Sequence, residues 1–330
     1  MRRRSFAITA ATAIAAFSFT LVPLLRIWVL PRVELAPLDI DSTDVSVGTG
    51  TYLDPATGKE AGPAQITITR HVLGDVADGE HTGYAVWDVA TRTDTPATIS
   101  APDPRQAFSF SVDRWVFDRH TDAPKPCCAD TVPIPDLPAA GTAYLKFPFE
   151  LGKHDYEVWD ATAKQYYVAH FDGTQTVDGR LLYRFAGTVP AVRIGSISVP
   201  GGVVGLTTSD VVAADEYYAN PREITLVDPM TGAPIEGSSH LRVTLRAPGG
   251  TADAAVALDV DVSSTAATIA ATSDRADRDD ARLALVTTTL PLAASGLGTA
   301  AVLTGVGMAV RGRSRRPDPL PEPVEGLVTP

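Results

Sequence analysis

Cys127 and Cys128 are the only cysteines in this chain of 330 residues, and they are adjacent. They lie in a proline-rich stretch, Pro124-Lys-Pro-Cys-Cys-Ala-Asp130. Within one chain, two adjacent thiols can be joined only to each other, in a strained vicinal disulfide; the alternatives are two free thiols or bonds to another chain. A structural zinc site normally needs four ligands, so these two alone do not form one. We predict a vicinal disulfide between Cys127 and Cys128 that stiffens a loop.

Charged residues beside the cysteines could carry acid–base chemistry, although a solvated loop accounts for them more simply. They are Asp118, Arg119, His120, Asp122 and Lys125. The six histidines are scattered without the spacing of metal ligands, and the sequence has no phosphate-binding glycine loop and no nucleophile elbow. We therefore predict no catalytic residue, no metal ligand and no cofactor.

Two uncharged stretches, residues 5–25 and 283–310, are long enough to cross a bilayer as helices. Arginines precede the first and follow the second, and positive charge near the ends of a span is retained in the cytoplasm. We expect a plasma-membrane anchor in residues 1–32, a second transmembrane helix in 283–310, both termini inside, and residues 33–282 outside. A cleaved signal peptide, of the twin-arginine type or otherwise, is the alternative for the first stretch, but no small-x-small cleavage site follows it.

The second stretch contains features that could shape and pair the helices. Pro291 predicts a kink or a helix start. Ala301, Gly305 and Ala309 are four residues apart and would allow another helix to approach closely, which favours pairing of the two spans over self-association. The tail, residues 311–330, has proline at every second position from Pro317 to Pro323 and is predicted to be a disordered cytoplasmic segment.

The segment between the spans is typical of β structure. Apolar and polar residues alternate with a period of two, and Asp-Pro, Thr-Gly and Asp-Gly turn signals separate the runs. Three such runs are 65–70, 108–113 and 241–246. Helices are expected at residues 207–218, which begin with capping residues, and at 274–282. We predict a mainly β fold, an antiparallel sheet arranged as a barrel or sandwich, with two flanking transmembrane helices.

The charge of the chain limits its partners. Nine of the 28 basic and three of the 39 acidic residues lie in 1–32 and 311–330, so the rest of the chain carries a net charge of −17. A domain this acidic is a poor candidate for binding nucleic acid, whose phosphates need cations. The expected partners are the lipid bilayer through the two spans, and an envelope lipid or another membrane protein.

Several sequence segments of this domain resemble those of an actinobacterial family of membrane proteins labelled "PorA family porin". They are residues 36–43, 141–149, 153–160, 177–185 and 225–232. Together with the two flanking spans, the resemblance covers most of the chain. It implies a membrane protein of the cell envelope with a pore-forming role. Because the strands have polar exposed faces and each chain has two helical spans, we expect any channel to require an oligomer.

The leading hypothesis is a non-enzymatic, membrane-anchored protein that binds or transfers an envelope component such as a lipid. Animal class B scavenger receptors share the two spans and the β-rich outer domain, which holds a lipid tunnel, but this analogy concerns architecture alone. Trp87, Trp115, Tyr156 and Trp159 are candidate residues for lining an apolar cavity, with ordinary core packing as the alternative. The other hypotheses are a pore-forming oligomer and a hydrolase or transferase of envelope polymers.

Overall fold

The computed structural model describes residues 2–129, 131 and 142–313. The chain divides into two compact units, residues 1–33 with 282–330, and residues 34–281, which we describe separately. The predicted tail lies outside the described residues from position 314 onward.

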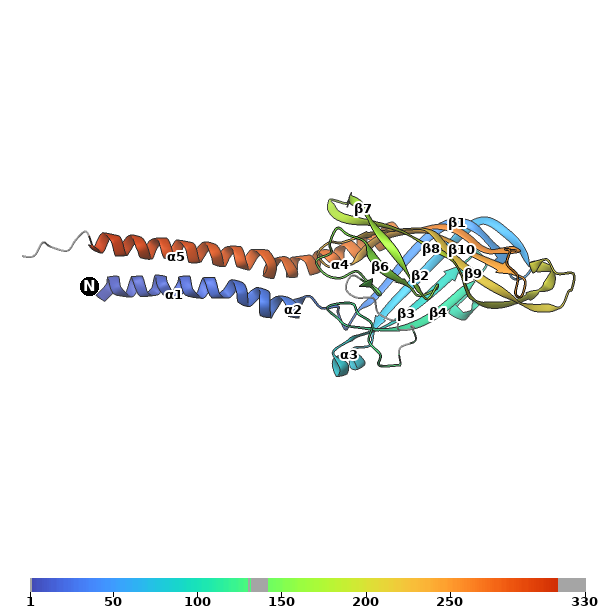
Figure 1. Ribbon diagram of the computed structural model, residues 1–330, viewed down its shortest axis with the longest axis horizontal. Helices are drawn as coiled ribbons and strands as arrows, with labels where there is room; N and C mark the ends of the chain where they lie inside the picture. The colour runs from blue at the N-terminus through green and yellow to red at the C-terminus, as the bar shows by residue number, and fades with distance from the viewer. Residues whose placement is uncertain (1, 130, 132–141, 314–330) are drawn as a thin grey trace, which may run out of the picture. The chain divides into compact units, whose positions relative to one another are not determined.

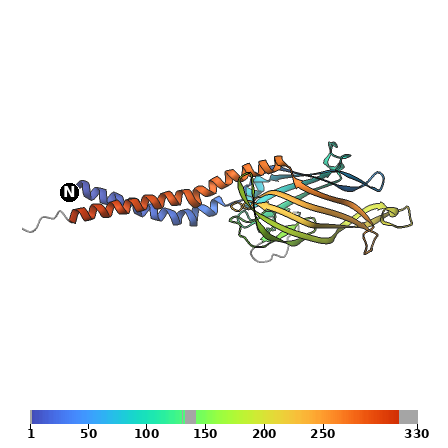
Figure 2. The ribbon, with the colours of Figure 1, turned by 90° about the horizontal axis from the view of Figure 1, so that it is seen from above.

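The first unit is a pair of apolar helices. Its elements are α1 (Arg2–Leu24), the π-helical turn η1 (Leu25–Val29), α2 (Leu30–Val33), the π-helical turn η4 (Leu285–Thr289) and α5 (Leu290–Arg313). The helical segments Phe6–Val33 and Ala266–Arg311 are long and apolar enough to cross a membrane. α1 and α5 lie side by side and run in opposite directions (Figure 1 and Figure 2). The two predicted spans therefore do pair.

Small side chains form the seam between α1 and α5. Ala11, Ala15 and Ser18 of α1 are buried, as is Ala294 of α5. A Cβ added to Gly298 would lie only 3.0 Å from the Cβ of Ser18. Such small residues let two helix backbones approach closely in a lipid environment, where packing rather than water exclusion drives helix association.

The seam uses only part of the face predicted for α5. Ala301 and Gly305 are half-buried, but Ala309 is exposed, so its assignment to the contact face was wrong. A step of four residues turns a helix by roughly 400°, about 40° more than a full turn, so positions that are always four apart drift off one side. The seam instead alternates steps of four and three. α5 begins at Leu290, one residue before Pro291, directly after the π-helical turn.

The second unit is built on one curled sheet, with the predicted mainly β, antiparallel fold (Figure 1). Its order is β4-β3-β2-β1-β11-β10-β9-β8-β7-β6-β5, and all neighbours are antiparallel except β5 and β6. The strands are β1 (Asp41–Asp54), β2 (Lys59–Gly74), β3 (Ala85–Asp94), β4 (Ser109–Phe117), β5 (Thr142–Ala143), β6 (Tyr156–Asp160), β7 (Gln165–Val177), β8 (Arg180–Pro200), β9 (Val211–Val227), β10 (Pro234–Arg246) and β11 (Ala255–Ser264). Three short helices, α3 (Val76–Thr82), η2 (Pro104–Gln106) and η3 (Gly201–Val204), lie in the connections.

The two faces of the sheet follow from the alternation in the sequence. Ile66, Val260 and Val262 are buried on the concave side, while Asp259 and Asp261 of the same strand β11 point outward. The outward carboxylates form ion pairs with basic residues of neighbouring strands, for example Arg242 with Asp259 at 2.9 Å. The three alternating runs predicted as strands lie in β2, β4 and β10, with residue 108 just before β4.

The helix predicted at residues 207–218 is wrong. Residues from Val211 onward belong to β9, which pairs with β8 on one side and β10 on the other. The capping pattern instead makes a tight turn, in which the Thr208 hydroxyl accepts from the backbone N–H of Asp210. Pairing along both edges and inward packing of Ala214 and Tyr218 outweigh the helical preference of the alanines.

The second predicted helix is confirmed as part of α4 (Ala266–Ala284), which follows β11. Ile269 and Ala276 of α4 pack on Leu182, Leu226 and Ile235 of the convex face of the sheet. A second contact is ionic. The guanidinium of Arg180 in β8 donates to Asp280 at 2.6 Å, to Asp228 at 2.5 Å and to Asp277.

Candidate functional site

Residues 118–129, which contain the two cysteines, form a loop after β4, the end strand of the sheet, and we call this segment the cysteine loop. The loop turns back along the outer edge of that strand. The N–H of Lys125 donates to the carbonyl of Val116 at 2.9 Å, and the N–H of Asp118 donates to the carbonyl of Ala123 at 2.8 Å. Thr131 continues this pairing, because its N–H donates to the carbonyl of Arg114 at 3.1 Å. The loop thus occupies backbone groups that an edge strand would otherwise expose.

The sulfurs of Cys127 and Cys128 are joined in the structure. Both side chains are half-buried. Cys128 and the next residue, Ala129, have φ angles of 61° and 55°, in the left-handed region that residues with a Cβ rarely adopt. The redox state of the pair in the native compartment, free thiols being the alternative, stays a prediction.

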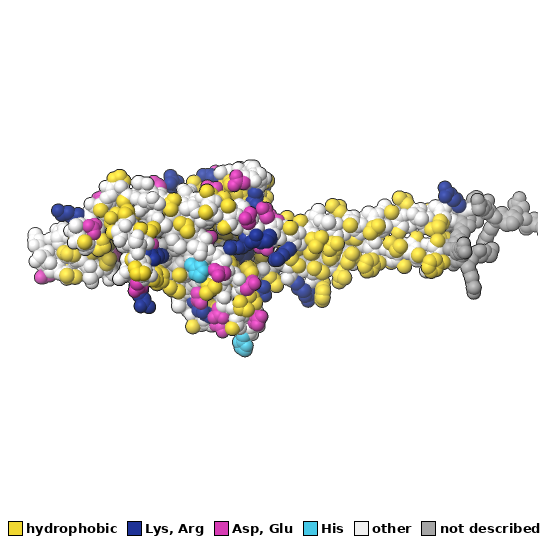
Figure 3. Space-filling model, turned by 180° about the vertical axis from the view of Figure 1, so that it is seen from behind, with side chains coloured by type: hydrophobic (Ala, Val, Ile, Leu, Met, Phe, Trp, Pro, Cys, Tyr) yellow, Lys and Arg dark blue, Asp and Glu magenta, His cyan; other side chains and the backbone are white. Residues whose placement is uncertain are grey.

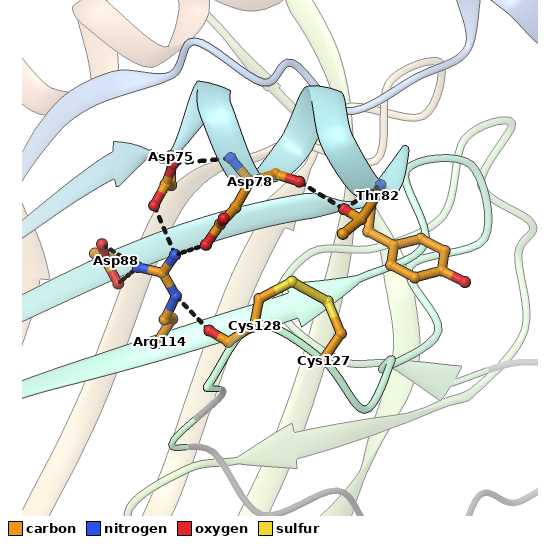
Figure 4. Close-up of polar contacts among 8 residues, drawn as sticks. Asp75, Asp78, Thr82, Asp88, Arg114, Cys127 and Cys128 are labelled. Carbon is orange, nitrogen blue, oxygen red and sulfur yellow. Dashed lines mark hydrogen bonds and ion pairs between the residues drawn. A yellow bond between two sulfur atoms is a disulfide. The ribbon is translucent and has the colours of Figure 1, made fainter.

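Arg114 of β4 lies at the centre of a polar network around this loop (Figure 4). Its Nε donates to the carbonyl of Cys128 at 2.8 Å, and its Nη1 donates to Asp88 at 2.9 Å. Its Nη2 donates to Asp75 and to Asp78, each at 2.6 Å. Asp88 reaches it from the opposite position on β3. One guanidinium thus faces three carboxylates, which leaves the cluster with two net negative charges when all are ionised.

The network is assembled by local structure. Asp75 is the N-cap of α3 and accepts the N–H of Asp78, so the cap that starts this helix also brings two carboxylates to Arg114. The hydrogen bond from Arg114, followed by that from the backbone of Asp78, holds the pKa of Asp75 below its usual value. Sequence analysis missed this network, because its three carboxylates lie 26 to 39 residues from Arg114 and only the cross-strand pair of Asp88 and Arg114 follows from register.

Asp122 fastens the same loop to a distant part of the chain. Its Oδ2 accepts three backbone N–H groups, from Tyr144 at 2.8 Å, Leu145 at 3.1 Å and Lys146 at 3.2 Å. The side chain is buried, and burial raises its pKa to about 6 against the opposing effects of Lys146 and these backbone donors. This carboxyl group joins the loop after β4 to the segment after β5, so the two ends of the sheet order meet.

The remaining charged residues predicted beside the cysteines anchor the loop. Asp118 accepts the N–H groups of His120 and Thr121, each at 3.0 Å, which forms the turn. Arg119 donates to the carbonyl of Ala36 at 2.7 Å, and His120 contacts the carbonyl of Glu34 at 2.9 Å. These contacts give Asp118, Arg119 and His120 a structural role in anchoring the loop.

A family model described as Porin PorA matches residues 9–307. The chain belongs to the PorA porin family. A relative described as Porin PorA, from Corynebacterium amycolatum, is 24% identical over 296 residues, with 69% of this chain and 75% of that protein covered. A solved structure of a DUF1329 family protein from Desulfovibrio piger aligns with 78% of this chain and 91% of that protein's chain at 10% identity. Its TM-score is 0.15, which is too low to indicate a shared fold.

In this PorA family chain, the aromatic residues predicted to line a cavity are buried. Trp87, Trp115 and Trp159 pack in one cluster, where Trp115 and Tyr144 have ring centroids 4.7 Å apart. Tyr156 packs in a separate apolar cluster that includes Phe147 and Phe185. None of the four predicted residues lines the cavity of about 250 Å³ formed by Gln175, Arg184, Ile224, Leu226, Glu236 and Ser238. Their cavity-lining role stays a prediction.

Two carboxyl groups bear on the hydrolase hypothesis for this PorA family chain. Tyr218 donates to Asp160 at 3.2 Å, and Asn220 donates to Glu223 at 2.7 Å. Burial raises the pKa of both carboxyls, and the charge of Asp160 raises that of Glu223 further. Because neighbouring donors occupy both groups, the pair supports no specific reaction and we assign none. Within residues 2–129, 131 and 142–313, no group of three or more histidine, cysteine or acidic side chains could hold a metal ion.

Proposed function

We propose that this PorA family protein is a non-enzymatic envelope protein that forms a porin-like pore as an oligomer of its helix pair. The family supports a porin-like role, and the two apolar helices fit a membrane anchor. In contrast, among the described residues no observation supports the lipid-transfer hypothesis.

The β domain is poorly suited to cross the bilayer itself. Its convex face carries ion pairs such as Arg222 with Asp261 and Arg242 with Asp259, whereas a transmembrane barrel needs an apolar outer band. Figure 3 shows charged side chains spread over the domain and hydrophobic side chains over the helices. The pore is therefore assigned to the helices.

A pore needs several copies, because α1 and α5 pack directly on each other and leave no lumen in one helix pair. The observation that carries the proposal is a second small-residue face on α5. It consists of Ala293, Gly296, Ala300, Thr304 and Gly307, all exposed. Gly296 lies about 200° around the helix from the seam residue Gly298, at about 100° per residue. A Cβ added to Gly296 or Gly307 meets nothing within 4 Å, so this face is open to a helix of a second copy.

Exposed threonines are the polar groups available to such a pore. Thr12 and Thr20 of α1 donate to carbonyls four residues earlier, and Thr299 of α5 does the same, at 2.8–3.0 Å. These bonds satisfy the hydroxyl protons in lipid, and the hydroxyl oxygens remain able to accept hydrogen bonds from water. A threonine-lined pore would be weakly polar and uncharged.

The test is conductance of the purified full-length protein in planar bilayers, with cross-linking in detergent to follow assembly. The wild-type chain should form oligomers and give stepwise currents. Gly296→Leu combined with Ala300→Leu should abolish both without disturbing the α1–α5 seam. Ala13→Leu on the exposed side of α1 is the matched control and should conduct normally. Absence of current from well-inserted wild type, or full current from the double variant, would refute the proposal.

A further inference from the structure

We propose that the Cys127–Cys128 pair is a redox site that exchanges with a dithiol reductant and controls whether the outer edge of β4 is covered. The inference does not depend on pore formation. It stands on the place of the pair in the cysteine loop, on the backbone conformation of that loop, and on the Arg114 network that holds it (Figure 4).

The two cysteine residues keep part of their surface exposed. Cys127 and Cys128 are both half-buried, and their neighbours Pro126 and Ala129 are exposed. No other cysteine exists in the chain, so any disulfide exchange begins here. By contrast, a disulfide buried in a protein core is shielded from an attacking thiolate.

The loop conformation depends on few restraints. Cys128 and Ala129 both have positive φ, which costs energy for residues with a Cβ and persists only when the surroundings impose it. Two features impose it here: the ring closed by the sulfur–sulfur bond, and the hydrogen bond from Arg114 Nε to the carbonyl of Cys128. Loss of the first restraint leaves only hydrogen bonds, that from Arg114 Nε and the flanking ones of Lys125 and Thr131, to hold two disfavoured residues.

The exchange is a balanced two-electron reduction. A thiolate of the dithiol attacks one sulfur, the Cys127–Cys128 bond breaks, and a mixed disulfide forms with the other cysteine released as a thiolate that takes up a proton. The second thiol of the reductant then attacks the mixed disulfide. The products are two cysteine thiols and the oxidised, cyclised reductant.

A dithiol suits this site better than a monothiol. A mixed disulfide with a monothiol would have the other cysteine directly beside it, and that cysteine could expel the monothiol and restore the starting bond. A dithiol resolves the intermediate with its own second thiol. In addition, the three carboxylates of Asp75, Asp78 and Asp88 outnumber the single positive charge of Arg114. The net negative charge repels an anionic reductant such as glutathione.

Reduction should uncover the end strand of the sheet. The loop and Thr131 beyond it cover this edge through hydrogen bonds from the Lys125 N–H to the Val116 carbonyl, from the Thr131 N–H to the Arg114 carbonyl, and from the Arg114 N–H to the Thr131 hydroxyl. When the loop relaxes, these backbone groups of β4 become free. A free edge strand can pair with an extended segment of another chain.

The experiment uses the full-length protein in detergent, purified without reductant. Alkylation followed by mass spectrometry should find no free thiol before treatment and two after dithiothreitol, with glutathione slower. Hydrogen–deuterium exchange should then speed up by about tenfold or more in peptides covering β4 and the loop, with β10 unchanged.

Cys127→Ser with Cys128→Ser should exchange fast without any reductant and should not respond to dithiothreitol. Two free thiols in the untreated protein would overturn the proposal. So would a reduced wild-type chain whose β4 exchanges as slowly as before. The wild-type comparison stands by itself if the double variant does not fold.

Discussion

Asp122 is a single buried carboxyl group that joins two segments far apart in the sequence. It has a φ of 60°, and its Oδ2 accepts three successive backbone N–H groups. The half-buried side chain of Lys146 is nearby, and burial lowers the pKa of its ammonium group against the attraction of Asp122. The three backbone donors satisfy Oδ2 of the carboxyl group, whereas Oδ1 is buried without a hydrogen bond in the described structure.

This environment predicts an unusual pH dependence. Burial raises the pKa of Asp122 from 3.8 to about 6, so the folded state holds this proton more tightly than the unfolded chain. The resulting stabilisation is fully present below pH about 4 and is lost as the pH rises through about 6, to an extent of roughly 3 kcal/mol. Asp122→Asn should lack this dependence, so its free energy of unfolding relative to wild type should rise between pH 4 and 7. Urea unfolding at several pH values measures the difference, and parallel wild-type and variant curves would contradict it.

At the scale of elements, the sequence predicted the sheet well because β periodicity is local. The alternating runs in β2, β4 and β10 are strands, since alternation alone decides which face is buried. The segment 207–218 was predicted as a helix from its caps and alanines, and β9 formed because neighbouring strands on both sides supplied hydrogen bonds. Pairing with the strands directly before and after it, which residues 207–218 alone do not reveal, therefore decided this element.

The candidate site was predicted only in part, for the same reason. The adjacency of Cys127 and Cys128 makes their bond visible in the sequence. Asp122 binds backbone groups 22 to 24 residues away, and Arg114 joins carboxylates from α3 and β3. No local pattern encodes these distances, so Arg114 and the role of Asp122 required the structure.

The helix pair gives a prediction about its own packing. A Cβ at position 305 would lie 3.6 Å from the Cβ of Ala11, a separation suited to a disulfide. Ala11→Cys with Gly305→Cys, in a chain whose two native cysteines are serine, should therefore cross-link on oxidation within one chain.

Adding Gly298→Leu to this pair should sharply reduce the cross-linking yield, because the side chain would collide with Ser18 and Phe19. Adding Gly296→Leu is the matched control and should leave the yield unchanged, since that position is open. Cross-linking is read as a mobility shift that a reductant reverses. Equal yields in the two backgrounds would show that the α1–α5 seam is not as described.

At the scale of the whole molecule, the distribution of charge predicts the membrane topology of the chain. Arginines lie at the start of α1 (Arg2 to Arg4) and at the end of α5 (Arg311), while residues 33–310 carry a net charge of −17. Insertion retains positive flanks on the cytoplasmic side. Both termini should therefore be inside and the β domain outside, in an oxidising compartment where the cysteine pair can form its bond.

This topology can be tested with protease and thiol reagents on sealed vesicles of known orientation. An N-terminal and a C-terminal tag should both be digested in inside-out vesicles and both be protected in right-side-out vesicles. After reduction, a membrane-impermeant maleimide should label Cys127 and Cys128 only in right-side-out vesicles.

Replacing Arg2, Arg3 and Arg4 with asparagine should mix the orientation of the N-terminus, whereas the same change at Arg105 in the β domain should not. Tags on opposite sides would contradict the two-span topology, and loss of the N-terminal tag on maturation would instead identify the first helix as a cleaved signal.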